Sequence, residues 1–282
     1  LTGFGQLALN ASFWRRGLAA MGQHIGWWPV LHVMARSIPA RYVPGSVWYA
    51  ASRVGMLRAA GVGMRALGVT ALLETVLTVI VSMTLGAALL GAAGRLPGDR
   101  LSGVVWALAL VVLVSPPVLN RLLAWVSWVR ASAASRRAGS TWRASATPDV
   151  APRLSWADQW ALVAWMAVYW LLSAVTFTLY LLAFGLDVAG PAVIAGTFLV
   201  AWVIGFLTPI APQGAGAFEA VFVALLAPPA PGAAIVVVAG FRALIGVRDA
   251  LAFGWAAWRG RQDAPVIAPD DDPARPAPPA PR

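Results

Sequence analysis

The chain has 282 residues, of which 60% are hydrophobic and only 11% are charged, and its mean hydropathy is +0.73. Soluble domains carry about 25% charged residues, so the composition excludes a soluble globule and indicates an integral membrane protein. Cysteine is absent, which excludes disulfides and thiolate chemistry. The net charge of +10 comes from arginines that lie between apolar runs, a placement that favours cytoplasmic membrane loops over nucleic-acid binding.

The first 65 residues hold an incomplete helix and an ambiguous apolar patch. The opening segment LTGFGQLALNASFW is typical of the end of a helix, so we expect a truncated N-terminus with membrane helices upstream. The patch at 25–40 has arginines on both flanks, and we expect both flanks in the cytoplasm. A re-entrant hairpin turning near Pro44-Gly45 satisfies this expectation. An interfacial helix with Trp27 and Trp28 at headgroup level satisfies it equally.

Long apolar runs predict membrane helices farther along the chain. Runs at 66–90, 101–119, 159–184, 191–207 and 233–258 suit about 30 Å of hydrocarbon. A shorter helix is predicted at 215–227. The fold class is therefore all-α, a polytopic integral membrane helix bundle, with broken or re-entrant helices near Pro44-Gly45 and Pro212-Gly216.

Arginine placement predicts the orientation and the domains. The arginine-rich segments 36–65 and 120–158 and the tail from 259 are expected in the cytoplasm, and the connections 91–100 and 185–190 outside. All three arginine-rich segments can lie on the same side of the membrane only if 208–232 crosses it once. We expect a membrane domain over 1–258, a cytoplasmic linker at 120–158 within it, and a disordered Pro/Ala-rich tail over 259–282.

The segment after 205 combines a backbone break with a carboxylate. Pro212, Gly214 and Gly216 interrupt an apolar run, and Glu219 follows. Irregular backbone at membrane depth needs surrounding protein or a water-filled cavity, and an ionisable group there indicates a functional site. The alternative is a tight loop with Glu219 near the membrane surface, in the first helical turn, where a carboxylate is favoured.

The segment around Pro44 repeats this order. Tyr42, Pro44 and Gly45 precede a helix start, and Arg53 follows. Transporters with inverted repeats show weak internal symmetry of this kind; chance resemblance is the other reading. If the symmetry is real, Arg53 and Glu219 face one cavity, and the open helix N-termini favour an anionic headgroup.

Four other charges fall inside predicted helices. Arg242 lies well within its helix and should need a partner. Arg248 and Asp249 are adjacent, so they are expected to point in different directions around the helix or to extend toward the cytoplasmic end. Glu74 is expected either to face the bundle or to lie near the interface.

The sequences at both breaks resemble motifs of a known protein family. Pro212, Gly214, Gly216 and Glu219 match the Pro-Gly-Gly-x-Gly-x-x-Glu signature of the lysylphosphatidylglycerol-synthase transmembrane family, also described as flippase-like; Gln213 replaces the first Gly. Residues 41–45, RYVPG, resemble its Lys/Arg-Tyr-x-Pro-Gly element, and 240–242, GFR, its aromatic-Arg element. The resemblance implies a membrane fold that moves lipid headgroups between leaflets. Some members carry an aminoacyl-transferase domain, which no part of this sequence resembles, so lysyl transfer is not expected.

These observations predict a flippase-like, multi-pass protein of a bacterial plasma membrane that translocates a phospholipid or polyprenyl-linked sugar. Arg53 and Arg242 would contact phosphate, because arginine matches phosphate oxygens bidentately, and Glu219 would pair with an arginine or a cationic headgroup. The substrate-binding residues are expected to be Tyr42, Pro44, Gly45, Arg53, Pro212, Gly214, Gly216, Glu219 and Arg242.

Two other functions stay open at this point. The first is a non-catalytic membrane partner or regulator of a cell-envelope glycosyltransferase, and the second is a membrane enzyme acting on a polyprenyl phosphate. The sequence holds no HExxH, GxSxG, Walker or GxGxxG motif, so we expect no enzyme, metal or cofactor. A charged, water-accessible cavity would favour the flippase. A filled bundle with Arg242 paired to a neighbour would favour the partner subunit.

Overall fold

The structure, a computed structural model, describes residues 2–44, 47–95, 154–185, 189–208, 212–227 and 229–262, with the single positions 118 and 121. Every regular element in these ranges is helical: eight α-helices and two 3₁₀ helices, η1 and η3. The all-α expectation is therefore confirmed. The predicted helix at 101–119 and most of the linker at 120–158 lie outside the described residues.

The N-terminal half contributes α1 (Thr2–Ala20), α2 (Trp27–Arg36), η1 (Ile38–Tyr42), α3 (Val47–Ala59) and α4 (Met64–Ala92). The C-terminal half contributes α7 (Trp156–Ala183), α8 (Pro191–Leu207), η3 (Pro212–Gly214), α9 (Ala217–Leu226) and α10 (Pro231–Gln262). The predicted runs at 66–90, 159–184 and 191–207 match α4, α7 and α8 to within a few residues. Helix α10 continues to Gln262, four residues into the predicted tail.

Helices α4 and α7 are, among the described helices, the two that are long and apolar enough to cross a membrane. Helices α8 and α9 are apolar but shorter. The ten residues of α9 rise about 15 Å, half of the hydrocarbon thickness. Helix α9 alone therefore does not make the full crossing that the arginine placement requires of 208–232, and the orientation of the chain stays a prediction.

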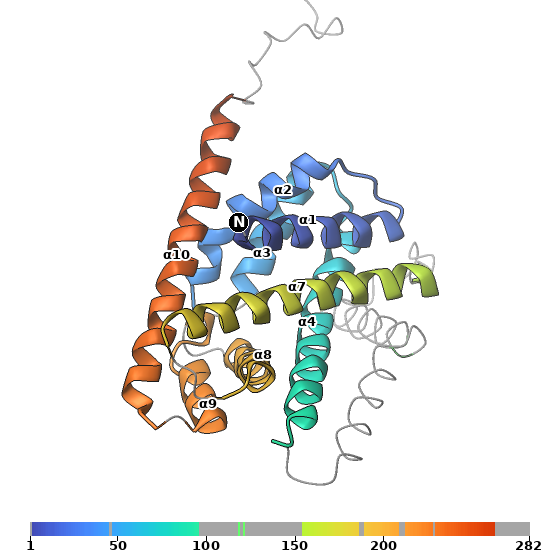
Figure 1. Ribbon diagram of the computed structural model, residues 1–282. Coiled ribbons are helices and arrows are strands. Elements are labelled where there is room, and N and C mark those ends of the chain that lie inside the picture. The colour runs from blue at the N-terminus through green and yellow to red at the C-terminus, as the bar shows by residue number, and fades with distance from the viewer. Residues whose placement is uncertain are drawn as a thin grey trace, which may run out of the picture.

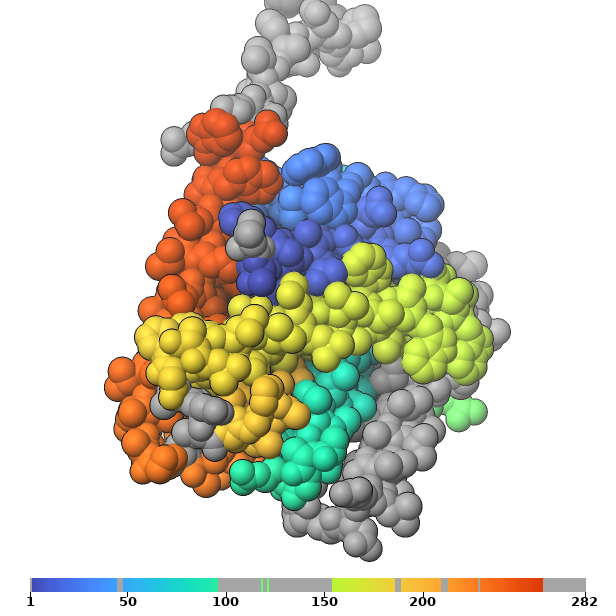
Figure 2. Space-filling model, in the orientation of Figure 1, coloured from blue at the N-terminus to red at the C-terminus, as the bar shows by residue number. Residues whose placement is uncertain are grey.

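Two layers of helices cross in the described part of the chain. Helices α1 and α7 lie side by side and run in opposite directions, while α4 crosses beneath α7 and packs on α8 (Figure 1). Helix α10 runs along one flank, where it contacts α1, α2, η1, α7 and α9. Figure 2 shows α7 lying across this face between α1 and α4.

Small residues and phenylalanines hold these crossings together. A Cβ at Gly196 would lie 2.9 Å from the carbonyl oxygen of Gly86, so only glycine lets α4 and α8 approach this closely. Phe177 of α7 lies at the centre of an aromatic cluster. Its ring centroid is 4.6 Å from that of Phe198 on α8 and 4.9 Å from that of Phe241 on α10. These contacts hold α4, α7, α8 and α10 closely together.

The start of α7 shows how local sequence fixes a helix. The Ser155 hydroxyl accepts the Asp158 backbone N–H at 3.0 Å, which satisfies one of the unpaired donors at the helix start. The Asp158 carboxylate lies in the first turn, where a negative charge is favoured, and pairs with Arg16 of α1 at 2.9 Å. This ion pair joins α1 to α7 at their outer ends.

Helices α2 and α3 lie on either side of the first break. They contact each other, and η1 and Val43-Pro44 follow α2 along the chain. Whether this segment is a re-entrant hairpin or an interfacial helix stays a prediction. Trp28 of α2 is 63% exposed, whereas Trp27 is partly buried and donates to the Ser12 hydroxyl at 3.1 Å. Gly45 lies outside the described residues.

Candidate functional site

The two Pro/Gly breaks meet in space. Element η1, which precedes the first break, contacts η3, which forms the second. Gln213 has φ of 52°, and Gly214 and Gly216 have φ of 66° and 85°. Only glycine adopts this left-handed region without steric cost. This explains why the family signature has a glycine at the position that Gln213 occupies here.

Gly214 allows a close approach as well as a positive φ. A Cβ at Gly214 would overlap the backbone of Gly205 in α8, whereas a Cβ at Gly216 would meet open space. Gly214 is therefore fixed by packing and by φ. Gly216 is required only by the turn that begins α9.

Glu219 and Arg242 join the second break to α10. The Arg242 Nε lies 2.5 Å from Glu219 Oε1, and the other Glu219 oxygen accepts the Gly216 backbone N–H at 2.7 Å. The Arg242 guanidinium also donates to the Gln213 carbonyl at 3.3 and 3.4 Å. Glu219 therefore pairs with an arginine, the first of the two kinds of partner that the sequence predicted for it. Together the two side chains hold the break in place.

Arg53 pairs with Glu74 instead. Its guanidinium is 1% exposed and lies 2.6 and 2.7 Å from the two Glu74 oxygens. Asn10 and Trp14 of α1 donate to the same carboxylate at 2.8 and 2.9 Å. The guanidinium stacks 3.7 Å from the ring centroid of Tyr49. Glu74 therefore faces the bundle, the first of the two positions expected for it.

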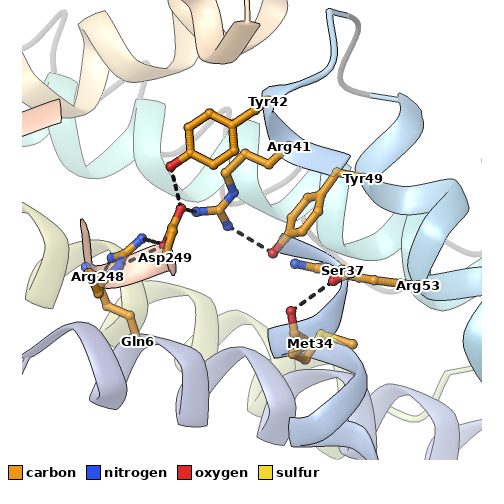
Figure 3. A network of polar contacts seen from close by, with 9 residues as sticks. All are labelled: Gln6, Met34, Ser37, Arg41, Tyr42, Tyr49, Arg53, Arg248 and Asp249. Atoms are coloured by element: carbon orange, nitrogen blue, oxygen red, sulfur yellow. Dashed lines mark hydrogen bonds and ion pairs between the residues drawn. The ribbon is translucent and has the colours of Figure 1, made fainter. Parts of the chain in front are cut away.

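Asp249 is the acceptor in a second polar cluster (Figure 3). Arg41 and Tyr42 donate to its Oδ2 at 3.2 and 3.0 Å. Arg248 donates to Oδ1 at 3.0 and 2.7 Å and to Gln6 at 2.6 Å. The expectation that Arg248 and Asp249 point apart is wrong, because the long arginine side chain folds back onto its neighbour.

A cavity of about 140 Å³ lies beside the Arg53–Glu74 pair. It reaches both breaks, at Val43 and at Gln213-Gly214, and Arg53 and Glu74 form its charged wall. The other described lining residues are uncharged apart from Arg41: Asn10, Tyr49, Ala50, Thr75, Thr78, Met166, Tyr169, Trp170, Trp202, Phe206 and Thr208.

A larger groove of about 390 Å³ adjoins this cavity. It runs between α1, α7, α8 and α10, and Phe198, Phe241, Leu244, Ile245 and Leu251 are among its walls. Arg41, Tyr169, Trp170 and Trp202 line both spaces. The Nε1–H of Trp170, a side chain 3% exposed, has no hydrogen-bond partner within the described part of the chain. A ligand oxygen would satisfy this buried donor.

The predicted site residues divide into two groups. Arg53 and Gly214 line the cavity, whereas Tyr42, Gly216, Glu219 and Arg242 are not among the described residues that line it. The hypothesis that Arg53 and Glu219 face one cavity is therefore wrong, because Glu219 turns back to its own helix start and to Arg242. Pro44 is exposed beside the cavity wall, and of Pro212 only the backbone is described.

Several site residues were missed by sequence reasoning. Asn10, Trp14 and Tyr49 contact the Arg53–Glu74 pair, and Gln6 and Tyr169 lie near Arg41. None carries a motif, and Asn10 and Trp14 contact a carboxylate about 60 residues away in the chain, at Glu74. One usable signal existed for Arg41, which stands in the RYVPG element directly before the first break.

The fold and site together define a helical membrane domain with a charged cavity between two broken segments. Residues 1–248 match the family described as the lysylphosphatidylglycerol synthase TM region, and the chain belongs to this family of membrane domains. No curated protein and no solved structure matches the chain.

Proposed function

We propose that this chain is a flippase-like protein that moves a phospholipid or a lipid-linked sugar between the leaflets of a bacterial plasma membrane, which it crosses several times. The lipid is not chemically changed, and the protein is therefore not an enzyme. The polar headgroup passes through the cavity between the breaks, while the acyl chains stay in the adjoining groove and the surrounding lipid.

The observation that carries this proposal is the junction between the charged cavity and the apolar groove. A lipid needs both environments at once, since its headgroup loses hydrogen bonds in hydrocarbon and its chains are excluded from water. The two spaces share Tyr169, Trp170 and Trp202. A volume of about 140 Å³ suits a headgroup, and the groove of about 390 Å³ suits part of an acyl chain.

The wall of the cavity supplies hydrogen bonds and one ion pair. Arg53 and Glu74 neutralise each other, and the hydroxyls of Thr75, Thr78 and Tyr169 belong to residues of the same lining, as does Arg41. Such groups exchange water for headgroup oxygens without holding one headgroup too tightly to release. The role expected of Arg242 and Glu219 changes accordingly: they fix the second break that forms the cavity wall.

The partner-subunit alternative is favoured by one observation. Arg242 is paired to a neighbour, as that function predicted. The same prediction required a filled bundle, whereas the charged cavity lies among α1, α3, α4, α7, α8 and the two breaks. A partner or regulator of a cell-envelope glycosyltransferase is therefore the second candidate.

Reconstituted vesicles test the proposal. Purified protein is placed in liposomes that contain a trace of phospholipid labelled with a fluorophore on its headgroup, and a membrane-impermeant reductant is added outside. We expect more than half of the label to be reduced with the protein, against about half in empty liposomes. Thr75→Trp, which fills the cavity, should abolish the excess, whereas Val175→Trp on the exposed face of α7 should keep it. Wild-type protein that gives the empty-liposome value with every lipid tested would contradict the proposal.

A further inference from the structure

Arg41 occupies the junction of three spaces. It lines the charged cavity, the apolar groove and a small pocket of about 30 Å³ between them. Among the described residues, Tyr169 is the other one that lines all three. If the headgroup of a lipid lies in the cavity and its acyl chains lie in the groove, the linkage between headgroup and chains lies beside Arg41. In a phospholipid, that linkage is the phosphodiester.

The partners of Arg41 leave it able to accept an anion. Its ion pair with Asp249 is long, 3.2 Å, and its side chain is 20% exposed, whereas the Asp249 side chain is 3% exposed. Its other hydrogen bond goes to the neutral hydroxyl of Tyr49 at 2.9 Å. Asp249 is already shared with Arg248 at 2.7 Å. One carboxylate therefore serves two arginines, and a second anion would complete the charge balance.

The charge balance of the described lining points the same way. Three arginines and two carboxylates line the three spaces: Arg41, Arg53, Arg248, Glu74 and Asp249. Arg53 and Glu74 cancel, so the net charge of +1 belongs to the cluster of Arg41, Arg248 and Asp249. A partly buried positive charge without a full counter-charge is costly. A group with one negative charge removes this cost.

We propose that Arg41 binds the phosphate of the transported lipid, and that Asp249 is the carboxylate that holds Arg41 and Arg248 when no lipid is bound. This inference rests on the proposed function and deepens it. The phosphate replaces the Asp249 oxygen on Arg41, because a guanidinium matches phosphate oxygens bidentately. Asp249 then keeps Arg248 and Tyr42. The net charge of +1 favours a headgroup with a single phosphodiester and no compensating cation.

The position of Arg41 suits such an exchange. It is the second-last residue of η1, two residues before Val43 and the first break. A small shift of this end would move the guanidinium from Asp249 toward the junction without unwinding a helix. The unsatisfied Nε1–H of Trp170 lies on the same junction and would donate to another oxygen of the headgroup.

Lipid binding in detergent tests this inference without any transport. Delipidated protein is mixed with phosphatidylglycerol, phosphatidylcholine or diacylglycerol of the same acyl chains, and the bound lipid is counted by native mass spectrometry. We expect phosphatidylglycerol to bind about tenfold more tightly than phosphatidylcholine, and diacylglycerol to bind most weakly, since charge-assisted contacts to phosphate are strong.

Single substitutions separate an effect on lipid binding from an effect on the fold. Arg41→Gln should reduce the preference for phosphatidylglycerol to about twofold, whereas Arg58→Gln, which removes an equal charge from the exposed end of α3, should keep it. Asp249→Asn should tighten phosphatidylglycerol binding, because it removes the competing carboxylate. If Arg41→Gln does not fold, Arg41→Lys replaces it in the test. Its preference for phosphatidylglycerol over phosphatidylcholine should be lower than that of the wild type and of Arg58→Gln, but should not be lost.

Opposite effects at Arg41 and Asp249 support phosphate exchange. Equal preference in wild type and Arg41→Gln would overturn it, and so would weaker binding in a folded Asp249→Asn protein. The two proposals fail separately. If the protein moves labelled lipid across the liposome bilayer and Arg41→Gln keeps the full preference for phosphatidylglycerol, only the Arg41 site is overturned. A preference that depends on Arg41 in a protein that moves no lipid supports the Arg41 site and overturns the proposed transport.

Discussion

The Arg53–Glu74 pair makes a quantitative prediction about stability. In Glu74→Gln, the guanidinium of Arg53 loses both carboxylate contacts and keeps the Tyr49 ring at 3.7 Å and a Ser37 hydroxyl at 3.4 Å. Arginine does not lose its proton inside proteins, so a side chain that is 1% exposed carries an unpaired charge. Breaking a buried pair in this way costs about 3–5 kcal/mol.

The reverse variant should cost less. In Arg53→Met, Glu74 keeps the donors Asn10 and Trp14, and it can take up a proton and become neutral. The double variant Arg53→Met/Glu74→Gln should recover part of the loss, since neutral replacements of a buried pair are often tolerated. The matched control is Arg16→Gln, which breaks the surface pair with Asp158, whose side chains are 47% and 28% exposed. That loss should be about 0–1 kcal/mol.

The assay is unfolding in mixed micelles with increasing SDS, followed by circular dichroism. The expected order of stability is wild type and Arg16→Gln highest, then Arg53→Met, then Glu74→Gln. If Glu74→Gln unfolds within about 0.5 kcal/mol of the wild type, a change typical of surface positions, the pair is not buried as described and the reasoning about its charge fails.

Three further predictions concern the second break and the orientation. Gly214→Ala should destabilise the fold by about 1–3 kcal/mol, because a Cβ there overlaps Gly205 and the residue has a positive φ; Gly190→Ala, with open space around it, is the control in the same SDS titration. Gln213→Gly should stabilise the fold by about 1 kcal/mol, since the left-handed conformation strains glutamine, and lower stability would refute that strain. Ser140→Cys, in a chain without native cysteine, should react with an impermeant maleimide only from the cytoplasmic side; labelling from outside alone would reverse the predicted orientation.

Helix positions could be predicted from the sequence because each depends on local composition. The apolar runs that became α4, α7 and α8 are long stretches whose hydropathy alone requires a helix in lipid. The second break was also visible, since Pro212, Gly214 and Gly216 cannot continue a regular helix. The turn at Pro44 was visible for the same reason. These features need no knowledge of neighbouring segments.

The partners of the charged residues could not be predicted, because they depend on how helices pack. Arg53 finds Glu74, 21 residues away, and Arg41 finds Asp249, 208 residues away. The symmetry argument placed Arg53 and Glu219 in one cavity, but the Glu219 carboxylate accepts the Gly216 N–H at the start of its own helix α9. The nearness of Arg242 to that helix start settled the pairing, and only the packing of α10 against α9 brings the two together.

Photochemical crosslinking from inside the cavity tests most directly whether a lipid headgroup enters it. A photoreactive residue replaces Thr75, which lines the cavity, or Val175, which is 51% exposed on α7 and is not among its described lining residues. The protein is placed in liposomes with phospholipid carrying a radioactive headgroup and illuminated. Lipid transit through the cavity predicts strong headgroup labelling from position 75 and little from position 175. Labelling from position 75 no greater than from position 175, in protein that moves lipid, would contradict the proposed route.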